Sequence, residues 1–263
     1  MKTAQELFKE RYERLSKTLA HEKADRTPVV LMEDAKAANH MGVKLSEYIS
    51  TIKVSNKVMI DYLKDMGDVD GIDQPFSAAL NFPMVFMSGI KLPGRDLPDD
   101  MLWQLDEKEV MTPEDYDTII NKGWNSFRAD YLPNRVNYDL QKTLKDLEYA
   151  GQATKNIEEA GYVVYAPVVH TLVNEALSGG RSMAKFMRDL YKIPDKVEAT
   201  LEVIQKEEME VLRQQIRAAK PLTVFVSPSR GASEFYAPKL WERFVWKYMK
   251  EVGDIIIEEG SIV

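Results

Sequence analysis

Ionisable and polar side chains follow each of four short apolar segments in this 263-residue chain. They are, in chain order, Glu33 and Asp34; Asp73 and Gln74; His170, Asn174 and Glu175; and Ser227, Ser229 and Arg230. Carboxyl groups are prominent in the set. Because clustered carboxylates raise one another's pKa, they suit general acid–base catalysis or metal binding. The sequence therefore predicts an acid-lined site, provided that the four segments end at the same place.

Several of these candidates also have a purely structural interpretation. Asp34 suits the N-cap of a following helix as well as it suits a pocket. A single histidine such as His170 more often bonds to a backbone carbonyl than takes part in catalysis. Arg230 is able to hold a carboxylate or phosphate through two hydrogen bonds, or to pair with one of the acids. Asp73 is the acid that its position favours most for the pocket.

A long segment, residues 74–111, is rich in proline and is expected to be irregular. Loops of this length inside a compact domain are usually functional. Its aromatic and methionine side chains, Trp103 among them, form either an apolar wall for an aromatic substrate or the packing of a lid. The sequence leaves both interpretations open.

The apolar segments predict four buried strands, separated by amphipathic helices. The strands are expected at residues 28–32, 69–73, 162–167 and 222–226. Such alternation indicates an α/β fold with a parallel sheet and helices outside it. No G-x-G-x-x-G follows the first strand, which argues against a dinucleotide-binding fold.

We therefore predict a (β/α)8 TIM barrel, of which residues 1–263 contain about the first four βα units in one domain. The last three residues are expected to begin a fifth strand. Working residues of such barrels follow the C-terminal ends of the strands, where the candidates stand. A half barrel would leave sheet edges unpaired, so the natural chain is expected to continue past Val263.

Composition excludes several other classes of protein. The net charge of −7 disfavours nucleic-acid binding, which needs a basic surface. Apolar runs are too short to span a bilayer, and the N-terminus lacks the apolar core of a secretory signal. A cytoplasmic protein is expected. There is no cysteine and only three histidines, so no zinc-ligand spacing is complete.

Five stretches carry a likeness to a known family through their shared order. They include LAHEKADRTPV at 19–29, GDVDGID at 67–73, LPGR at 92–95 with TPEDYD at 112–117, residues 167–194, and SRG at 229–231 within residues 229–260. Together they resemble the uroporphyrinogen decarboxylase superfamily over most of the chain. Residues 92–117 are similar to its corrinoid-dependent methyltransferase, or O-demethylase-like, branch.

Departures from the decarboxylase pattern are informative. Decarboxylases carry R-Q-A-G-R after the first strand, whereas residues 33–37 read EDAKA here. A polyanionic tetrapyrrole would be repelled by acids at this place. Asp73 matches the decarboxylase aspartate, but Glu175 stands where a tyrosine is expected. The resemblance therefore favours the methyltransferase branch.

That branch implies transfer of a methyl group from a small donor, such as methanol, a methylamine or an aromatic methyl ether, to the cobalamin-like corrinoid of a partner protein. The resemblance implies zinc as a Lewis acid, with ligands expected beyond Val263. The expected catalytic residues are Asp73, Glu175 and Glu33; the expected substrate-binding residues are His170, Asn174, Ser229, Arg230 and Trp103. Two alternatives are a decarboxylase whose substrate-binding segment at residues 33–37 is altered, and a non-catalytic barrel relative. The oligomeric state stays open between monomer and homodimer.

Overall fold

Short parallel strands form the centre of the computed structural model, which describes residues 2–32 and 34–263. One sheet has the order β1-β2-β5 and a second pairs β6 with β7, all in parallel. The bounds are β1 (Val30–Leu31), β2 (Gly71–Ile72), β5 (Val163–Val164), β6 (Val168–Thr171) and β7 (Val224–Ser227). Each of the four predicted strand regions thus contains a strand, the third of them β5, and a further strand that was not predicted, β6, follows β5.

The two parallel sheets are consecutive in the sequence. Only residues 165–167 separate β5 from β6. Beyond β7, Ile262 forms a parallel bridge with Thr223, so the chain's last residues lie where a fifth strand was expected. This succession of parallel neighbours confirms the predicted α/β alternation.

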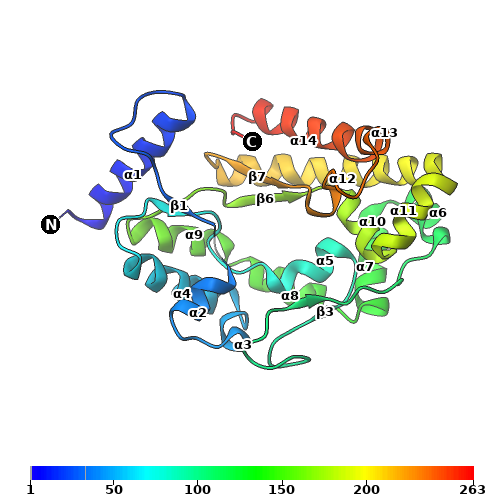
Figure 1. The fold of residues 1–263 in the computed structure, drawn as a ribbon, viewed down its shortest axis with the longest axis horizontal. Helices are drawn as coiled ribbons and strands as arrows, with labels where there is room; N and C mark the ends of the chain where they lie inside the picture. The colour runs from blue at the N-terminus through cyan, green and yellow to red at the C-terminus, as the bar shows by residue number, and fades with distance from the viewer. Residues whose placement is uncertain (1, 33) are drawn as a thin grey trace.

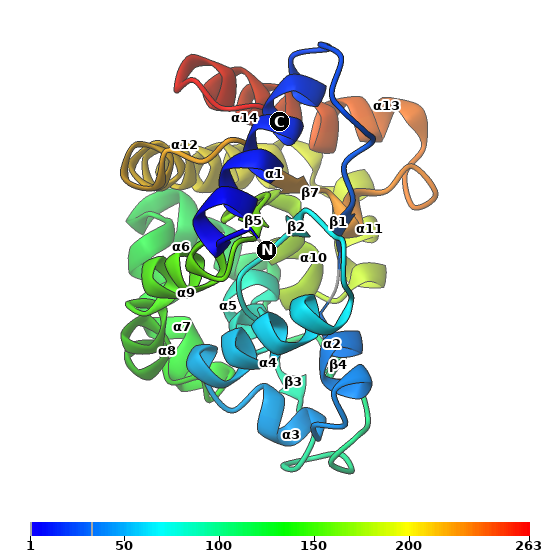
Figure 2. The same cartoon turned by 90° about the vertical axis from the view of Figure 1, so that its left-hand side faces the viewer.

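Helices connect the strands. They are α1 (Ala4–Leu19), α2 (Ala35–His40), α3 (Leu45–Tyr48), α4 (Ile52–Asp65), α5 (Phe82–Phe86), α6 (Pro113–Lys122), α7 (Trp124–Arg135), α8 (Leu140–Leu147), α9 (Ala150–Glu159), α10 (Asn174–Gly180), α11 (Met183–Lys192), α12 (Pro194–Ala219), α13 (Pro238–Trp241) and α14 (Lys247–Glu258). Helices α12 and α14 run side by side along β6 and β7 (Figure 1). Helices α2, α3 and α4 lie at the opposite end of the molecule (Figure 2). Within residues 2–32 and 34–263, no helix is both long and apolar enough to cross a membrane.

Local sequence signals explain where several helices begin. The sequence Thr-Pro-Glu-Asp at 112–115 predicts a helix start, and Thr112 and Asp115 do form a reciprocal capping box at the start of α6, with Pro113 in the first turn. Pro194 likewise opens α12. These starts depend on neighbouring residues only, which is why sequence reasoning located them.

Two sequence-based expectations need correction. Residues 74–111 are not uniformly irregular: they contain a 3-10 turn (Ala79–Asn81), α5 and an antiparallel hairpin of β3 (Ile90–Lys91) with β4 (Gln104–Leu105). The sequence predicts a helix from His170 to Ser178, but this helix begins only at Asn174, because Val168 to Thr171 pair with β7 as a strand. Two adjacent β-branched valines favour that extended conformation.

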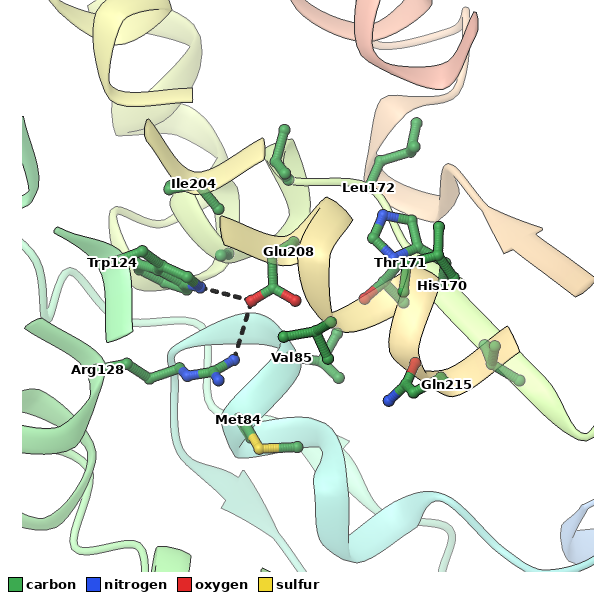
Figure 3. A pocket seen from close by; sticks show the side chains of 15 residues that line it. Met84, Val85, Trp124, Arg128, His170, Thr171, Leu172, Ile204, Glu208 and Gln215 are labelled. Atoms are coloured by element: carbon green, nitrogen blue, oxygen red, sulfur yellow. Dashed lines mark hydrogen bonds and ion pairs between the residues drawn. The ribbon is translucent and has the colours of Figure 1, made fainter. Parts of the chain in front are cut away.

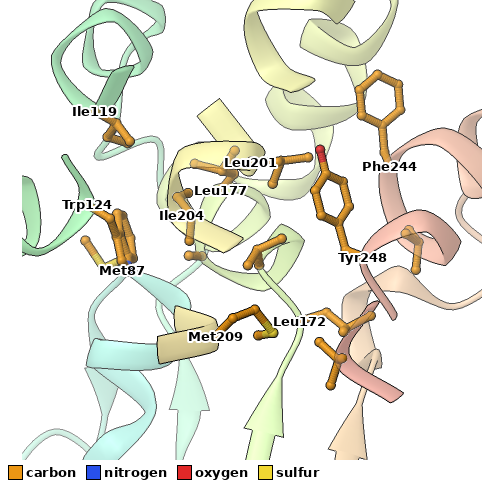
Figure 4. Close-up of a cluster of buried hydrophobic side chains, with 14 of the residues drawn as sticks. Met87, Ile119, Trp124, Leu172, Leu177, Leu201, Ile204, Met209, Phe244 and Tyr248 are labelled. Carbon is orange, nitrogen blue, oxygen red and sulfur yellow. The ribbon is translucent and has the colours of Figure 1, made fainter. Parts of the chain in front are cut away.

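Two clusters of buried hydrophobic side chains make the core. The larger one joins α12 and α14 to β6, β7, α6 and α7. Figure 4 shows Leu201 and Ile204 of α12 between Trp124 on one side and Tyr248 of α14 on the other. The smaller cluster packs α4 against β2 and the loop after it. The core thus supports the ends of β6 and β7 through α12.

Helix α10 approaches α5 so closely that a side chain at Gly179 has no room. A Cβ placed there would lie 1.9 Å from the carbonyl oxygen of Phe86. We expect Gly179→Ala to lower the free energy of unfolding by about 3 kcal/mol, because backbone has to move. Urea unfolding measures this change.

Gly151 in α9 is the matched control, because a Cβ there meets nothing within 4 Å. Gly151→Ala is expected to stabilise the protein by about 0.5–1 kcal/mol through helix propensity. Equal effects of the two substitutions would contradict the close approach of α10 and α5.

Candidate functional site

Glu175 and Arg230 come together at the ends of neighbouring strands. Glu175 lies in the first turn of α10, after β6, and Arg230 lies in a 3-10 turn (Ser229–Gly231), after β7. The backbone N–H of Arg230 donates to Oε1 of Glu175 at 2.6 Å. The guanidinium of Arg230 donates to the carbonyl of Ser178 at 3.1 Å and to Glu107 at 2.5 Å. The structure thus brings together three predicted residues, Glu175, Ser229 and Arg230.

Burial sets the protonation of Glu175. Its side chain is fully buried, and this loss of solvation raises its pKa to about 7. The hydrogen bond from the Arg230 backbone, the Ser229 side chain and the charge of Arg230 oppose the shift but do not cancel it. Because a pKa near the working pH is best for proton transfer, Glu175 suits a general acid.

Unfilled hydrogen-bonding capacity surrounds Glu175. Among residues 2–32 and 34–263, no hydrogen bond of ordinary geometry reaches Oε2 of Glu175, either polar atom of the Asn174 side chain, or the hydroxyl of Tyr236. Ser229 lies near Glu175, and Asn174 near Tyr236, in looser contacts. All three side chains are buried. Buried polar atoms of this kind nearly always bind water, a ligand or another group. Tyr236 was missed by sequence reasoning, because it stands in a loop well beyond the strand end.

A second pair of acids follows β1 and β2, which pair in parallel as Val30 with Gly71 and Leu31 with Ile72. Burial is the main reason that the pKa of Asp34 is raised to about 6, and the charge of Asp73 adds to it. The hydroxyls of Ser77 and Tyr48 oppose the shift. The Asp34 side chain makes no capping hydrogen bond to α2, so its interpretation as a helix cap is wrong.

The remaining candidates lie elsewhere or cannot be placed. Glu33 lies outside the described residues. Trp103 packs against Phe82, with ring centroids 6.4 Å apart, at the edge of the smaller core cluster. His170 lines a cavity whose lining includes neither Glu175 nor Arg230.

A metal site was expected to need residues beyond Val263. Within the described parts of the chain, no three His, Cys, Asp or Glu side chains are grouped so that they could hold a metal ion. The residues present therefore do not by themselves fit a zinc ion.

The raised pKa of Glu175 makes stability depend on pH. The folded protein keeps this proton up to about pH 7, whereas an unfolded chain releases it near 4.5. Stability from this group is therefore full below pH 4.5 and is lost as pH rises towards 7. We expect Glu175→Gln to gain about 3 kcal/mol relative to wild type between pH 4.5 and 8.

Urea unfolding of both proteins at the two pH values measures that gain. Other titrating groups, such as Asp34, are common to both proteins and cancel in the difference. A difference in stability that is the same at pH 4.5 and pH 8 would show that Glu175 titrates normally.

Comparison with known proteins gives the fold. No protein-family model and no curated protein matches this sequence. Among solved structures, a methyltransferase from Methanosarcina mazei is similar, with a TM-score of 0.61 and 13% sequence identity. The match covers 95% of this chain and 67% of that one. At this identity the likeness establishes a shared α/β fold.

Proposed function

We propose that this protein is a methyltransferase, which moves a methyl group from a small methylated oxygen compound to the corrinoid of a partner protein. The observation that carries the proposal is the protonatable Glu175 at the ends of two neighbouring parallel strands. Support comes from the fold shared with a methyltransferase over 95% of the chain. Parallel strands that pair in chain order, β1-β2-β5 in one sheet and β6-β7 in another, support the (β/α)8 barrel that we propose as the architecture.

Removing a methyl group from an oxygen requires a proton. When the bond between carbon and oxygen breaks, its electron pair stays on the oxygen, which then needs protonation to leave as an alcohol or phenol. Glu175 with a pKa of about 7 is partly protonated at neutral pH, and it would give that proton from the buried Oε2, which makes no hydrogen bond of ordinary geometry with the described residues. This is general acid catalysis.

The neighbours of Glu175 suit a neutral oxygen rather than a cation. The amide of Asn174 and the hydroxyl of Tyr236 are uncharged and have hydrogen-bonding capacity left. Arg230 is paired with Glu107, so its charge is already balanced. Asn174 and Tyr236 would orient the donor.

The corrinoid would accept the methyl group and is carried by the partner. The described residues supply no set of ligands for zinc. The residues of this chain would bind the donor, keep water from it and deliver the proton.

The test is an anaerobic assay of the full chain with cob(I)alamin as the corrinoid probe and zinc present. Methanol, a methylamine and methyl phenyl ether are offered in turn, and methylcobalamin is followed by its absorbance. We expect product with an oxygen donor. No methylcobalamin from any donor would refute the proposal. Formation of coproporphyrinogen from uroporphyrinogen would instead favour the decarboxylase alternative.

A further inference from the structure

The turn Ser229–Gly231, which follows β7, holds the carboxyl of Glu175 through its backbone. The N–H of Arg230 donates to Oε1 of Glu175 at 2.6 Å. The turn is only three residues long, lies outside the sheet and leads into an irregular segment, residues 232–237. The position of the Glu175 carboxyl therefore depends on the side chains that hold this turn in place.

Trp241 of α13 contacts the same turn from the side of the following helix. Its indole N–H donates to the carbonyl oxygen of Gly231 at 2.9 Å. Val245 also lies against Gly231: a Cβ at Gly231 would be 3.0 Å from Cγ1 of Val245 and 3.1 Å from Nδ2 of Asn174. The turn is therefore packed between the start of α10, which carries Glu175, and the segment that carries Trp241 and Val245.

A π-helical turn, Glu242–Trp246, connects α13 with α14. In a regular α-helix two residues five positions apart lie about 140° apart around the axis, on different faces. The wider i→i+5 bonding of a π turn brings them to one face, and such turns are frequent at functional sites. Trp241 and Trp246 accordingly stack, with ring centroids 5.6 Å apart and planes at 17°. This stacking orients the Trp241 indole, so the π turn supports its bond to Gly231.

The ionisable groups that face Glu175 keep one charge state near neutral pH. Arg230 remains charged, and burial raises the pKa of Tyr236 above its ordinary value, so this hydroxyl stays neutral. Helix α5, which packs on α10, has no ionisable side chain. Asp189, the buried charge of α11, is paired with Arg181. A change in proton uptake at this place near pH 7 therefore reports on Glu175.

We propose that Trp241 is a positioning residue for Glu175: it binds the carbonyl of Gly231 and so fixes the turn whose backbone N–H holds the carboxyl. A hydrogen bond to the charged carboxylate favours the deprotonated state. Trp241 thereby also sets the pH at which Glu175 gives up its proton. Its importance for catalysis rests on the proposed methyl transfer, whereas the control of Glu175 by the turn does not.

The first test removes the indole N–H and follows the Glu175 carboxyl directly. In protein labelled with carbon-13 at the carboxyl carbon of glutamate, the Glu175 resonance is identified by its loss in Glu175→Gln and titrated by NMR. In Trp241→Phe the turn should loosen and the bond from the Arg230 N–H weaken, so we expect the titration midpoint to rise by about one pH unit. An unchanged or lowered midpoint would overturn the proposal. No donor or corrinoid is needed, so this result is independent of the methyl-transfer assay.

The matched control is Trp124→Phe. The indole N–H of Trp124 donates to Glu208 at 2.7 Å, as a dashed line in Figure 3 shows. Trp124 belongs to the core cluster against which Trp241 also packs. The control variant loses a bond of the same kind and should destabilise the protein, but the Glu175 midpoint should keep its wild-type value. An equal rise in both variants would show general loosening and would overturn the role of Trp241.

Gly231→Ala tests the turn without changing Trp241, and it provides the decision if Trp241→Phe does not fold. The added methyl group meets Val245 and Asn174, so the turn has to shift. We expect the midpoint of Glu175 to rise here too, and in the active enzyme the pH above which activity falls should move with it. A midpoint equal to that of wild type would show that the turn does not control Glu175.

Discussion

Glu175→Gln is expected to slow methyl transfer by about 100- to 10,000-fold, the usual contribution of a general acid. Glutamine keeps the size of the side chain and its ability to accept from the Arg230 backbone, but it has no acidic proton to give. The loss should appear in kcat for donors whose leaving group needs protonation. Wild-type activity should itself fall above about pH 7, since Glu175 then loses its proton.

The control for this variant is Glu107→Gln. Glu107 pairs with the guanidinium of Arg230 and is about half exposed, so its replacement disturbs Arg230 without removing the proton donor. We expect less than a tenfold change, as is usual for an exposed ion pair. If both variants lost activity equally, positioning by Arg230 would be the explanation. If Glu175→Gln kept full activity while wild type was active, the proton donor would be another group.

Asp70→Ala is expected to lower the free energy of unfolding by about 3–5 kcal/mol, because it breaks a buried ion-pair network. Asp70 is completely buried at the start of the second strand region. Its carboxylate pairs with the buried Arg14 of α1 and accepts from Arg26 at 2.8 Å and from the backbone N–H of Val29 at 2.7 Å. Without it, Arg14 keeps only Asp25 and Glu10, at the surface.

Asp68→Ala is the matched control, two residues away. Asp68 also contacts Arg26, at 3.1 Å, but its side chain is 81% exposed. Its replacement should leave the urea midpoint unchanged, since exposed pairs contribute little. A small effect of Asp70→Ala would mean that α1 is held by its apolar contacts and not by this network.

Much of the local structure follows from the sequence. The capping box at Thr112, the start of α12 at Pro194 and the strand regions were predicted because each depends on residues close together in the chain. The separate strand β6 was not predicted. Val168 to Thr171 form a strand because β7 lies alongside, and β7 is more than fifty residues away.

The placement of His170 likewise could not be predicted from residues close to it in the chain. From the sequence it was a substrate-binding candidate in a helix, near Glu175. In the structure it lies on the same buried face of β6 as Val168 and lines a cavity with residues of α12. Which face of a strand a residue occupies depends on register, and a short shift in element boundary changes its neighbours.

The sequence by itself determined which chemical groups follow the strands: acids, an asparagine and an arginine, without the arginine-rich segment of decarboxylases. Only the tertiary structure decided what these groups can do. The pKa values of Glu175 and Asp34 are raised because distant segments remove water from around them. The packing of distant segments also brings Tyr236 to the site. Desolvation is a property of the packed fold, and no spacing along the chain encodes it directly.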